Sequence, residues 1–320
     1  MIAYIIRRLA QSFVVFVIVM MITFALPYFQ QGGTLAPAFI VLSNHASPAA
    51  VHLWGVQNGI FHPFFVRFWD YFVQVVYHFN LGFSWKQNES VWALISVYVP
   101  RTIWLALISL IITVVVALPI GVVQASRRNT IFDYTMTNFL FILYGVPAFL
   151  LSLLMINWFV FQSFHLPLPP TDGSSLQIFT NPLPFILPVM TLSILNLAFF
   201  SRFMRSAVLD VLVQDYIRTA KAKGGSQRRV LFRHAFRNAL GPIIVILGLS
   251  IPALFGGALI IEEVFNYEGV GYATVQAAQF NDLPVVLGIT LLITVLTLLG
   301  NLLADIMLGV VNPRIRVEGK

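Results

Sequence analysis

The residues best placed for a specific chemical task form one basic segment, residues 215–240, which lies between two long apolar stretches. The segment reads DYIRTAKAKGGSQRRVLFRHAFRNAL. Its charged side chains would be costly at the depth of a lipid bilayer, so we expect it to lie outside the membrane. Apolar and basic residues alternate up to a Gly-Gly pair, and a second helical pattern follows. This arrangement is typical of noncovalent docking, in which a membrane protein presents a basic element to another protein.

Local signals in this segment predict two short helices joined at a glycine. Asp215 favours the start of the first helix, as a cap or through the positive end of the helix dipole. Gly224 and Gly225 permit the left-handed backbone that ends a helix, and Ser226 can cap the next one. The second helix carries an apolar face of Val230, Leu231, Ala235 and Leu240. An ordinary basic loop is the alternative, but a charge bias alone does not require a helix–glycine–helix pattern.

Residues for covalent or metal chemistry are not apparent in the sequence. The chain has no cysteine, which rules out disulfides and thiolate metal sites. Its six histidines include no close i, i+4 pair of the metal-binding type, and only His234 lies in the basic segment. No G-x-x-x-x-G-K-[ST] sequence is present, so the chain cannot hydrolyse ATP by that device. We therefore predict no catalytic residue, no metal ion and no bound cofactor.

The composition indicates an integral membrane protein. Of the 320 residues, 58% are hydrophobic and only 10% are charged, whereas soluble domains carry about 25% charged residues. The net charge of +7 could suggest a nucleic-acid partner. The basic residues lie beside apolar spans, however, as membrane topology predicts, and we expect no nucleic acid.

Six stretches are apolar enough to cross a bilayer, which takes about 20 residues per helix: residues 9–30, 102–124, 132–161, 183–203, 241–261 and 285–310. Most of the 19 Lys and Arg residues fall on one side if the N-terminus is placed in the cytoplasm. The positive-inside rule then puts both termini in the cytoplasm, residues 31–100 outside and residues 204–240 inside. We expect one all-α transmembrane domain, residues 1–320, in the cell membrane.

The N-terminal third holds two ambiguous features. The first apolar stretch could be a signal peptide, but no small-residue cleavage site follows it, so we expect a retained helix. Residues 36–56 resemble a seventh span, but they have no clean apolar run, and an extra crossing would violate the positive-inside rule. Aromatic residues recur at helical spacing over residues 61–72, which predicts an amphipathic helix at the outer interface. That helix could be a gate, a platform for an external partner, or simply packing against lipid.

Helix-breaking residues interrupt three of the predicted spans. They are Pro147, Pro188 and Pro252, the last followed by Gly256 and Gly257. Such breaks are tolerated where the freed backbone groups meet protein or a cavity, which makes these residues candidates for a translocation path. The alternative is that Pro and Gly are simply common in membrane helices.

Ionisable residues are absent from the middle of every predicted span, which lowers the prospect of a proton-coupled secondary transporter. Glu262 lies at the outer end of the fifth span, where it could meet an external partner or simply be solvated.

The basic segment resembles the coupling loop of bacterial ABC importer permeases of the oligopeptide/dipeptide/nickel type. The general pattern is Glu-Ala-Ala, three residues, then Gly, and the matching positions here are Arg218, Thr219, Ala220 and Gly224. The Glu and the first Ala are absent, and RTAKAKG is the form usual in this subfamily. Gly225 stands where Leu is usual.

Further stretches carry the same resemblance along the chain. They are YIIRRLAQSFVVFVIVMMITF, NLGFS, IGVVQASRRNTIFDYTMTNF, EEVFNYEGVGY and NLLADIMLGVVNPRIRV. In the fourth, the matching positions include Glu262, Phe265, Gly269 and Gly271, while Glu268 replaces the usual Pro. An Asp-x-Pro pattern matches Asp282 and Pro284, and Asn312 stands where Asp is usual. Residues 31–80 show no match and look lineage-specific.

The resemblance implies a type I ABC importer permease with six transmembrane helices and an extracytoplasmic segment after the first. Such a subunit pairs with a second permease, most often a different one, above two ATPase subunits that use ATP and Mg²⁺. An extracytoplasmic binding protein delivers the cargo, here expected to be an oligopeptide or dipeptide. The resemblance implies that Asp215, Arg218, Thr219, Ala220, Lys223, Gly224, Arg229 and His234 form the ATPase-coupling loop. Glu262, Phe265, Gly269, Gly271 and Asp282 are candidates for an external loop.

Three alternatives stay open at the level of the sequence. The chain could be a secondary transporter or channel that is not driven by ATP, or a membrane subunit with no transport role. The same importer class could also carry nickel or a sugar instead of a peptide.

Overall fold

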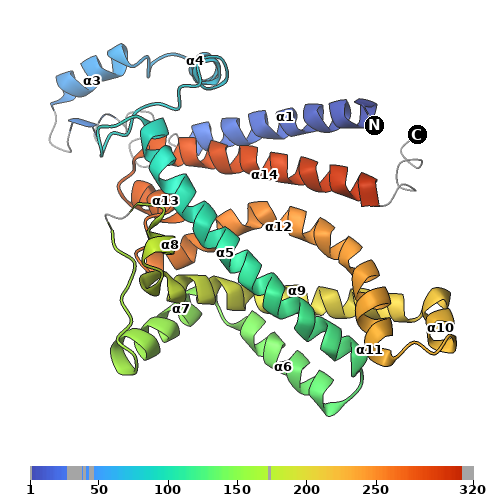
Figure 1. The fold of residues 1–320 in the computed structure, drawn as a ribbon. Coiled ribbons are helices and arrows are strands. Elements are labelled where there is room, and N and C mark those ends of the chain that lie inside the picture. Colours follow the sequence, from blue (N-terminus) through green and yellow to red (C-terminus); the bar gives the residue numbers. More distant parts are fainter. Residues whose placement is uncertain (1, 27–37, 39–40, 43–46, 172–173, 312–320) are drawn as a thin grey trace. The chain divides into compact units, whose positions relative to one another are not determined.

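The computed structural model describes residues 2–311 except residues 27–37, 39–40, 43–46 and 172–173 (Figure 1). Helices dominate this part of the chain, and its only extended pairing is one isolated bridge between Phe83 and Ser90. The chain divides into two compact units. One comprises Met1–Val99 and Tyr272–Leu299, and the other comprises Pro100–Gly271 and Gly300–Lys320. Asn312, the basic C-terminal residues and most of residues 27–46 lie outside the described part.

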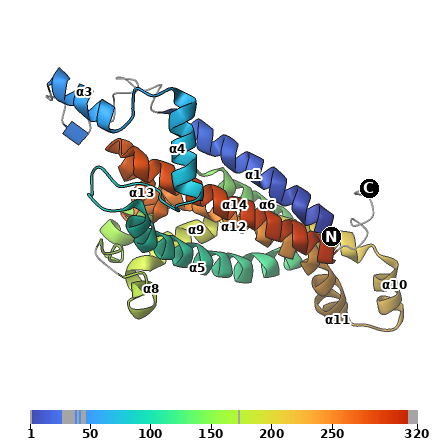
Figure 2. The same cartoon turned by 90° about the horizontal axis from the view of Figure 1, so that it is seen from above.

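The first unit contains α1 (Ile2–Ala25), α3 (Pro48–Gln57), α4 (Phe64–Val76), the start of α5, most of α13 (Val270–Gln279) and most of α14 (Leu283–Val311). α3 has ten residues and α4 has thirteen, too few for either to cross a bilayer. α4 confirms the helix that the aromatic spacing predicts over residues 61–72. It runs crosswise to the end of α1 (Figure 2).

Aromatic packing fixes α4 on α1. The ring of Phe24 lies 5.8 Å from Phe64, 5.9 Å from Phe68 and 5.1 Å from Tyr71, measured between ring centroids. Phe65 and Trp69, on the neighbouring side of α4, stay exposed. α4 also carries Arg67, Asp70 and Gln74 at helical spacing, so it is amphipathic, as expected of a helix that lies at a membrane interface.

The second unit holds most of α5 (Val91–Ser126) and the helices from α6 to α12. These are α6 (Ile131–Gly145), α7 (Ala148–Ile156) with the π-helical turn η3 (Asn157–Gln162), α8 (Gln177–Thr180), the 3-10 turn η4 (Leu183–Phe185), α9 (Ile186–Leu212), α10 (Asp215–Ala222), α11 (Gln227–Arg229), the π-helical turn η5 (Val230–Phe236) and α12 (Arg237–Val264). α9 is the central helix, since it packs against α12, α6 and α7. α10 and α11 lie at one end of this unit, and α7 and α8 lie at the other (Figures 1 and 2).

Five helices among the described residues are long and apolar enough to span a membrane, or six if one bent pair counts as a single span. The bent pair is Ile131–Gly145 with Ala148–Gln162, and its halves meet at 95°. α5 is 36 residues long, so it extends well beyond the predicted stretch 102–124 and includes Pro100 and Pro119. The predicted stretch 9–30 falls partly on α1, and residues 27–30 lie outside the described part.

The predicted helix breakers behave differently from one another. Pro147 lies at the 95° bend, where Val146 is extended (ψ 123°), because proline disfavours helical geometry in the residue before it. Pro188 breaks nothing: it lies in the first turn of α9, where its missing N–H has no helical partner to lose. α12 also continues as one helix through Pro252, Gly256 and Gly257. The prediction of a break at Pro188 and Pro252 is therefore wrong, and among the described residues only the third span is broken.

α5 and α9 cross closely through small and polar residues. A Cβ added to Gly121 would lie 2.5 Å from the Ser201 carbonyl oxygen and 2.8 Å from the Met204 Cβ. The Ser193 hydroxyl donates to the Ser109 carbonyl at 3.1 Å, and the Thr113 hydroxyl donates to the Ser193 carbonyl at 3.2 Å. Small residues that let backbones approach, with hydrogen bonds between the helices, are the usual basis of helix association in lipid.

Replacing Gly121 with Ala should lower the free energy of unfolding by about 1–3 kcal/mol, because the new methyl group forces α5 and α9 apart. The helix propensity of Ala would favour the opposite result. Gly145→Ala is the matched control, since a Cβ there has no atom within 4 Å. Tryptophan fluorescence melting in detergent compares the two variants. Equal melting temperatures would show that the crossing tolerates a methyl group.

Candidate functional site

The basic segment, residues 215–240, folds as predicted into two helices joined at a glycine, and we call this segment the elbow. α10 begins after Gln214, which makes no side-chain cap. Asp215 lies in the first turn, where its negative charge stabilises the helix by interacting with the positive end of the helix dipole. Gly224 has φ +79°, the left-handed conformation that ends the helix. The Gly225 N–H then donates to the Ala220 carbonyl at 3.1 Å and closes the turn. The Ser226 hydroxyl caps α11 by accepting from the Arg229 N–H at 3.4 Å.

Buried apolar side chains anchor the elbow to the spanning helices. Ile217 of α10 and Ala235 of η5 are fully buried, and Val230 is 2% exposed. They join one cluster with residues of α5, α9 and α12: Leu118, Val122, Ala125, Met204, Val208, Ala239 and Ile243. The predicted apolar face of the second helix is confirmed, with Leu231 and Leu240 partly buried against the same cluster. The elbow is therefore a packed extension of the helices and not a loose loop.

The outward face of the elbow is basic and carries two exposed rings. Tyr216 is 45% exposed and Phe232 is 50% exposed. Phe232 lines a cavity of about 380 Å³ with Ser226, Arg228, Arg229 and Arg233. Of the predicted coupling residues, Asp215, Arg218, Thr219, Lys223, Gly224 and Arg229 are exposed, whereas Ala220 and His234 are partly buried. An aromatic anchor surrounded by positive charge suits an acidic partner surface with an apolar pocket.

A second cluster of predicted residues surrounds a buried carboxylate at the end of α12. Glu262 has no exposed surface, so the expectation that it is solvated at a helix end is wrong. Its Oε1 accepts from the Thr102 hydroxyl at 2.6 Å, and its Oε2 accepts from the Gly271 N–H at 2.6 Å. The Val270 N–H donates to the Thr102 hydroxyl at 2.8 Å. The start of α13 is thus tied to α5 through the Glu262 carboxylate.

The glycines of this cluster are there because of close packing. A Cβ on Gly269 would lie 2.4 Å from the Glu262 carboxyl carbon, and one on Gly271 would lie 2.3 Å from the Leu259 Cα. Phe265, the other predicted residue of this stretch, is fully buried in the adjoining apolar cluster. These four residues therefore form a compact internal junction, not an exposed loop surface.

An ion pair and a buried phenol flank the same junction. Arg101 Nη1 lies 2.7 Å from Glu268 Oε2, so the residue that replaces the usual Pro gains a charged partner. The Tyr267 hydroxyl donates to the Arg101 carbonyl at 2.8 Å. Burial, together with the nearby Glu262 charge, raises the pKa of the Tyr267 phenol. The phenol therefore stays protonated at physiological pH and keeps this hydrogen bond.

Asp282 has a separate structural role in the first unit. It is 3% exposed, and its carboxylate accepts from the Ser84 hydroxyl and from the backbone N–H groups of Trp85 (3.1 Å) and Lys86 (3.2 Å). A Cβ on Gly82, which has φ +93°, would lie 3.5 Å from the Pro284 Cβ. The NLGFS stretch and the Asp-x-Pro pattern are therefore contact partners, which neither stretch indicates on its own.

A polar cluster between α5, α6 and α9 was not predicted. Arg205 holds the Asp133 carboxylate with two hydrogen bonds, Nε to Oδ1 at 2.8 Å and Nη2 to Oδ2 at 2.6 Å. Gln124 accepts from the Ser201 hydroxyl at 3.0 Å and donates to the Thr137 hydroxyl at 3.2 Å. The sequence did contain a signal for this cluster, because Gln124 and Asp133 both lie in the stretch IGVVQASRRNTIFDYTMTNF. That stretch was used only as evidence of the family resemblance, and no contact was predicted from it.

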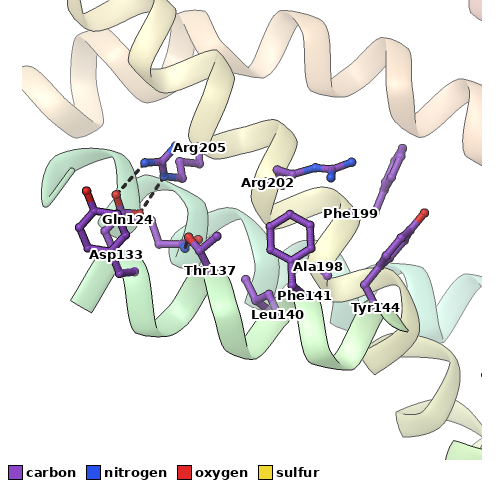
Figure 3. A pocket seen from close by; sticks show the side chains of 11 residues that line it. Gln124, Asp133, Thr137, Leu140, Phe141, Tyr144, Ala198, Phe199, Arg202 and Arg205 are labelled. Atoms are coloured by element: carbon purple, nitrogen blue, oxygen red, sulfur yellow. Dashed lines mark hydrogen bonds and ion pairs between the residues drawn. The ribbon is translucent and has the colours of Figure 1, made fainter. Parts of the chain in front are cut away.

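This cluster borders a cavity of about 300 Å³ (Figure 3). It is lined by Gln124, Asp133, Tyr134, Thr137, Leu140, Phe141, Tyr144, Ala198, Phe199, Arg202 and Arg205. The Asp133–Arg205 pair lies at one end, and the rings of Phe199 and Tyr144 lie at the other, with Arg202 between them (Figure 3).

Comparison with known proteins supports the resemblance to transport-system permeases over nearly the whole chain. Residues 117–317 match the family of the binding-protein-dependent transport system inner membrane component, and residues 1–106 match the N-terminal part of such membrane components. The second match includes residues 31–80, so the expectation that this region is lineage-specific is wrong.

Relatives match end to end. The chain is 35% identical to the oligopeptide transport system permease protein AppB of Bacillus subtilis (strain 168), over 98% of this chain and 99% of that protein. It is 33% identical to the dipeptide transport system permease protein DppB of Escherichia coli (strain K12), over 99% of each. With its apolar helices, the chain is a multi-pass membrane protein that belongs to the family of inner membrane components of binding-protein-dependent transport systems.

Proposed function

We propose that this chain is one permease half of an ATP-driven importer that takes up oligopeptides or dipeptides from an extracytoplasmic binding protein. The elbow carries this proposal, because it is a rigid, exposed and basic surface that the transmembrane fold alone does not need. Two of the relatives are named as permeases for oligopeptides and for dipeptides, which supports a peptide cargo. The second permease subunit is expected to be a different chain of the same family.

The elbow is built to pass movement from a partner to the membrane helices. Gln227 to Val264 forms one unbroken helical course through α11, η5 and α12. Ile217 joins α10 to the same buried cluster as α9 and α12. A partner that pulls or rotates the elbow therefore moves α12 as a lever, which is the rigid-body type of switching.

The chemistry of the cycle belongs to the partners in this proposal. Two ATPase subunits bind ATP and Mg²⁺ and dock on the elbow from the cytoplasm, and the chain binds no cofactor itself. Both termini lie in the cytoplasm, in keeping with the positive-inside rule. Alternating access then exposes the peptide path to one side at a time, and the 95° bend at Pro147 is a candidate wall of that path.

Uptake of a labelled peptide into proteoliposomes tests the proposal. The vesicles contain the chain, its partner permease, the two ATPases and the external binding protein. We expect uptake that requires ATP on the ATPase side and the binding protein on the other, with unlabelled oligopeptide or dipeptide competing. Uptake driven by a proton gradient without ATP would contradict the mechanism. Competition by nickel or a sugar, and not by peptide, would contradict the cargo.

A further inference from the structure

We propose that the cavity between α6 and α9 binds an anionic phospholipid, with its phosphate on Arg202 and an acyl chain along the aromatic residues. The inference goes beyond the transport function and rests on the proposed topology only for the choice of leaflet. It starts from the charges in the cavity. Arg205 is neutralised by its two hydrogen bonds to Asp133. Among the described residues Arg202 forms no ion pair, so the cavity keeps one positive charge.

The depth of Arg202 fits a lipid headgroup. The spanning helix Leu183–Leu212 needs about 20 residues to cross the hydrocarbon core. Counted from Leu183, the core ends close to Arg202. Asp133 lies in the first turn of α6 at the same end of the unit, where it pairs with Arg205. In the proposed orientation this is the inner leaflet, where basic pockets between spanning helices recognise anionic headgroups.

The shape and lining of the cavity fit the first part of an acyl chain. On α6 its lining runs from Asp133 to Tyr144, twelve residues that span about 16 Å of helix. The end away from the ion pair is apolar and aromatic, with Leu140, Phe141 and Tyr144 from α6 and Ala198 and Phe199 from α9. Phe141 and Tyr144 are 52% and 58% exposed, so the cavity is open to its surroundings and not sealed.

Arg202 is held where it can serve both parts of such a ligand. Its guanidinium carbon lies 5.9 Å from the centre of the Phe141 ring, and Figure 3 shows it between the polar and the aromatic ends. Arg side chains suit this role because they stack on rings while binding phosphate through two N–H groups. A peptide would also bring an ammonium group. The cavity has no free carboxylate for it, because the Asp133 oxygens are engaged by Arg205.

Native mass spectrometry of the assembled transporter tests the proposal with two lipids of identical acyl chains, dioleoyl-phosphatidylglycerol and dioleoyl-phosphatidylcholine. We expect preferential binding of the anionic lipid. Arg202→Gln should weaken that binding about fivefold, the effect of one basic residue at an anionic membrane surface. Arg202→Lys keeps the charge but loses the paired N–H contacts and the stacking on Phe141, so its binding should fall between wild type and Arg202→Gln. Arg128→Gln, a basic residue near the same end of α6 but outside the cavity, should leave it unchanged.

A second measurement locates the lipid independently of how any variant folds. A phosphatidylglycerol with a photoreactive acyl chain should label residues 137–144 or 198–203. Labelling elsewhere only, or equal binding by wild type and Arg202→Gln, would overturn the proposal. Displacement of the lipid by inorganic phosphate alone would show a free-anion site, and displacement by the transported peptide would assign the cavity to cargo. Binding by the isolated chain but not by the assembled transporter would show that the partner permease covers the cavity. ATP-driven uptake is measured in a separate assay, so none of these results decides whether the proposed transport function is right.

Discussion

Gly224→Val should weaken the docking of the ATPase subunits about five- to thirtyfold and reduce ATP-driven uptake with it. Gly224 has φ +79°, and a Cβ there would have open space around it, so the cost arises in the backbone alone. A residue with a side chain pays about 1–2 kcal/mol in the left-handed region, and β-branched Val is among the least tolerant. If the partner binds only the native elbow, this cost appears directly as lost affinity. Copurification of the ATPases with the solubilised permease measures it.

The chain offers a matched control for this substitution. Gly59 lies in the turn after α3 with φ +63°, and a Cβ there also has no atom within 4 Å. Gly59→Val therefore introduces the same strain away from the elbow and should leave docking intact. Gly224→Asn should have a smaller effect than Val, because Asn tolerates the left-handed region. Equal ATPase recovery from Gly224→Val and wild type would mean that the elbow geometry is not what the ATPases recognise.

Glu262→Ala should lower the free energy of unfolding of the permease by about 2–5 kcal/mol. The substitution leaves the Gly271 N–H without its acceptor at 2.6 Å and the Thr102 hydroxyl without the carboxylate that it contacts. A buried polar group that loses its partner costs about 1–3 kcal/mol. Packing would suffer as well, because Gly269 and Gly271 lie directly against the carboxylate. Melting followed by tryptophan fluorescence in detergent measures the loss.

The neighbouring Glu263 provides the control for Glu262. Among the described residues its Oε2 is buried without a hydrogen-bond partner, so removing this side chain removes the free-energy cost of burying an unsatisfied oxygen. Glu263→Ala should therefore be neutral or stabilising, although it deletes the same chemical group from the same helix. Glu262→Gln should fall between wild type and Ala, since its amide oxygen replaces only one of the two acceptors. Equal melting of the two Ala variants would show that the Glu262 bonds contribute no net stability.

The sequence alone determined the features that depend on neighbours along the chain. The elbow follows from Gly224, which readily adopts a left-handed backbone, and from Ser226, which caps the helix that starts beside it. The amphipathic helix α4 follows from aromatic residues at helical spacing. The spanning helices follow from the apolar runs, because about 20 consecutive apolar residues are long enough to cross the hydrocarbon core of a bilayer. The family resemblance was also readable, because its patterns keep their order and spacing.

Only the tertiary structure decided which distant residues meet, and so which of these patterns are surfaces and which are internal junctions. Glu262 looked like a solvated helix end, yet Thr102 and Gly271 enclose it. Asp282 looked like part of an external loop, yet Ser84 and the N–H groups after it bind its carboxylate. Pro147 lies at the bend between α6 and α7, whereas Pro188 lies in the first turn of α9, where a missing N–H costs the helix little. Hydrogen bonds and close packing depend on distances in space, and residues 160 to 198 positions apart carry no local signal of their contact.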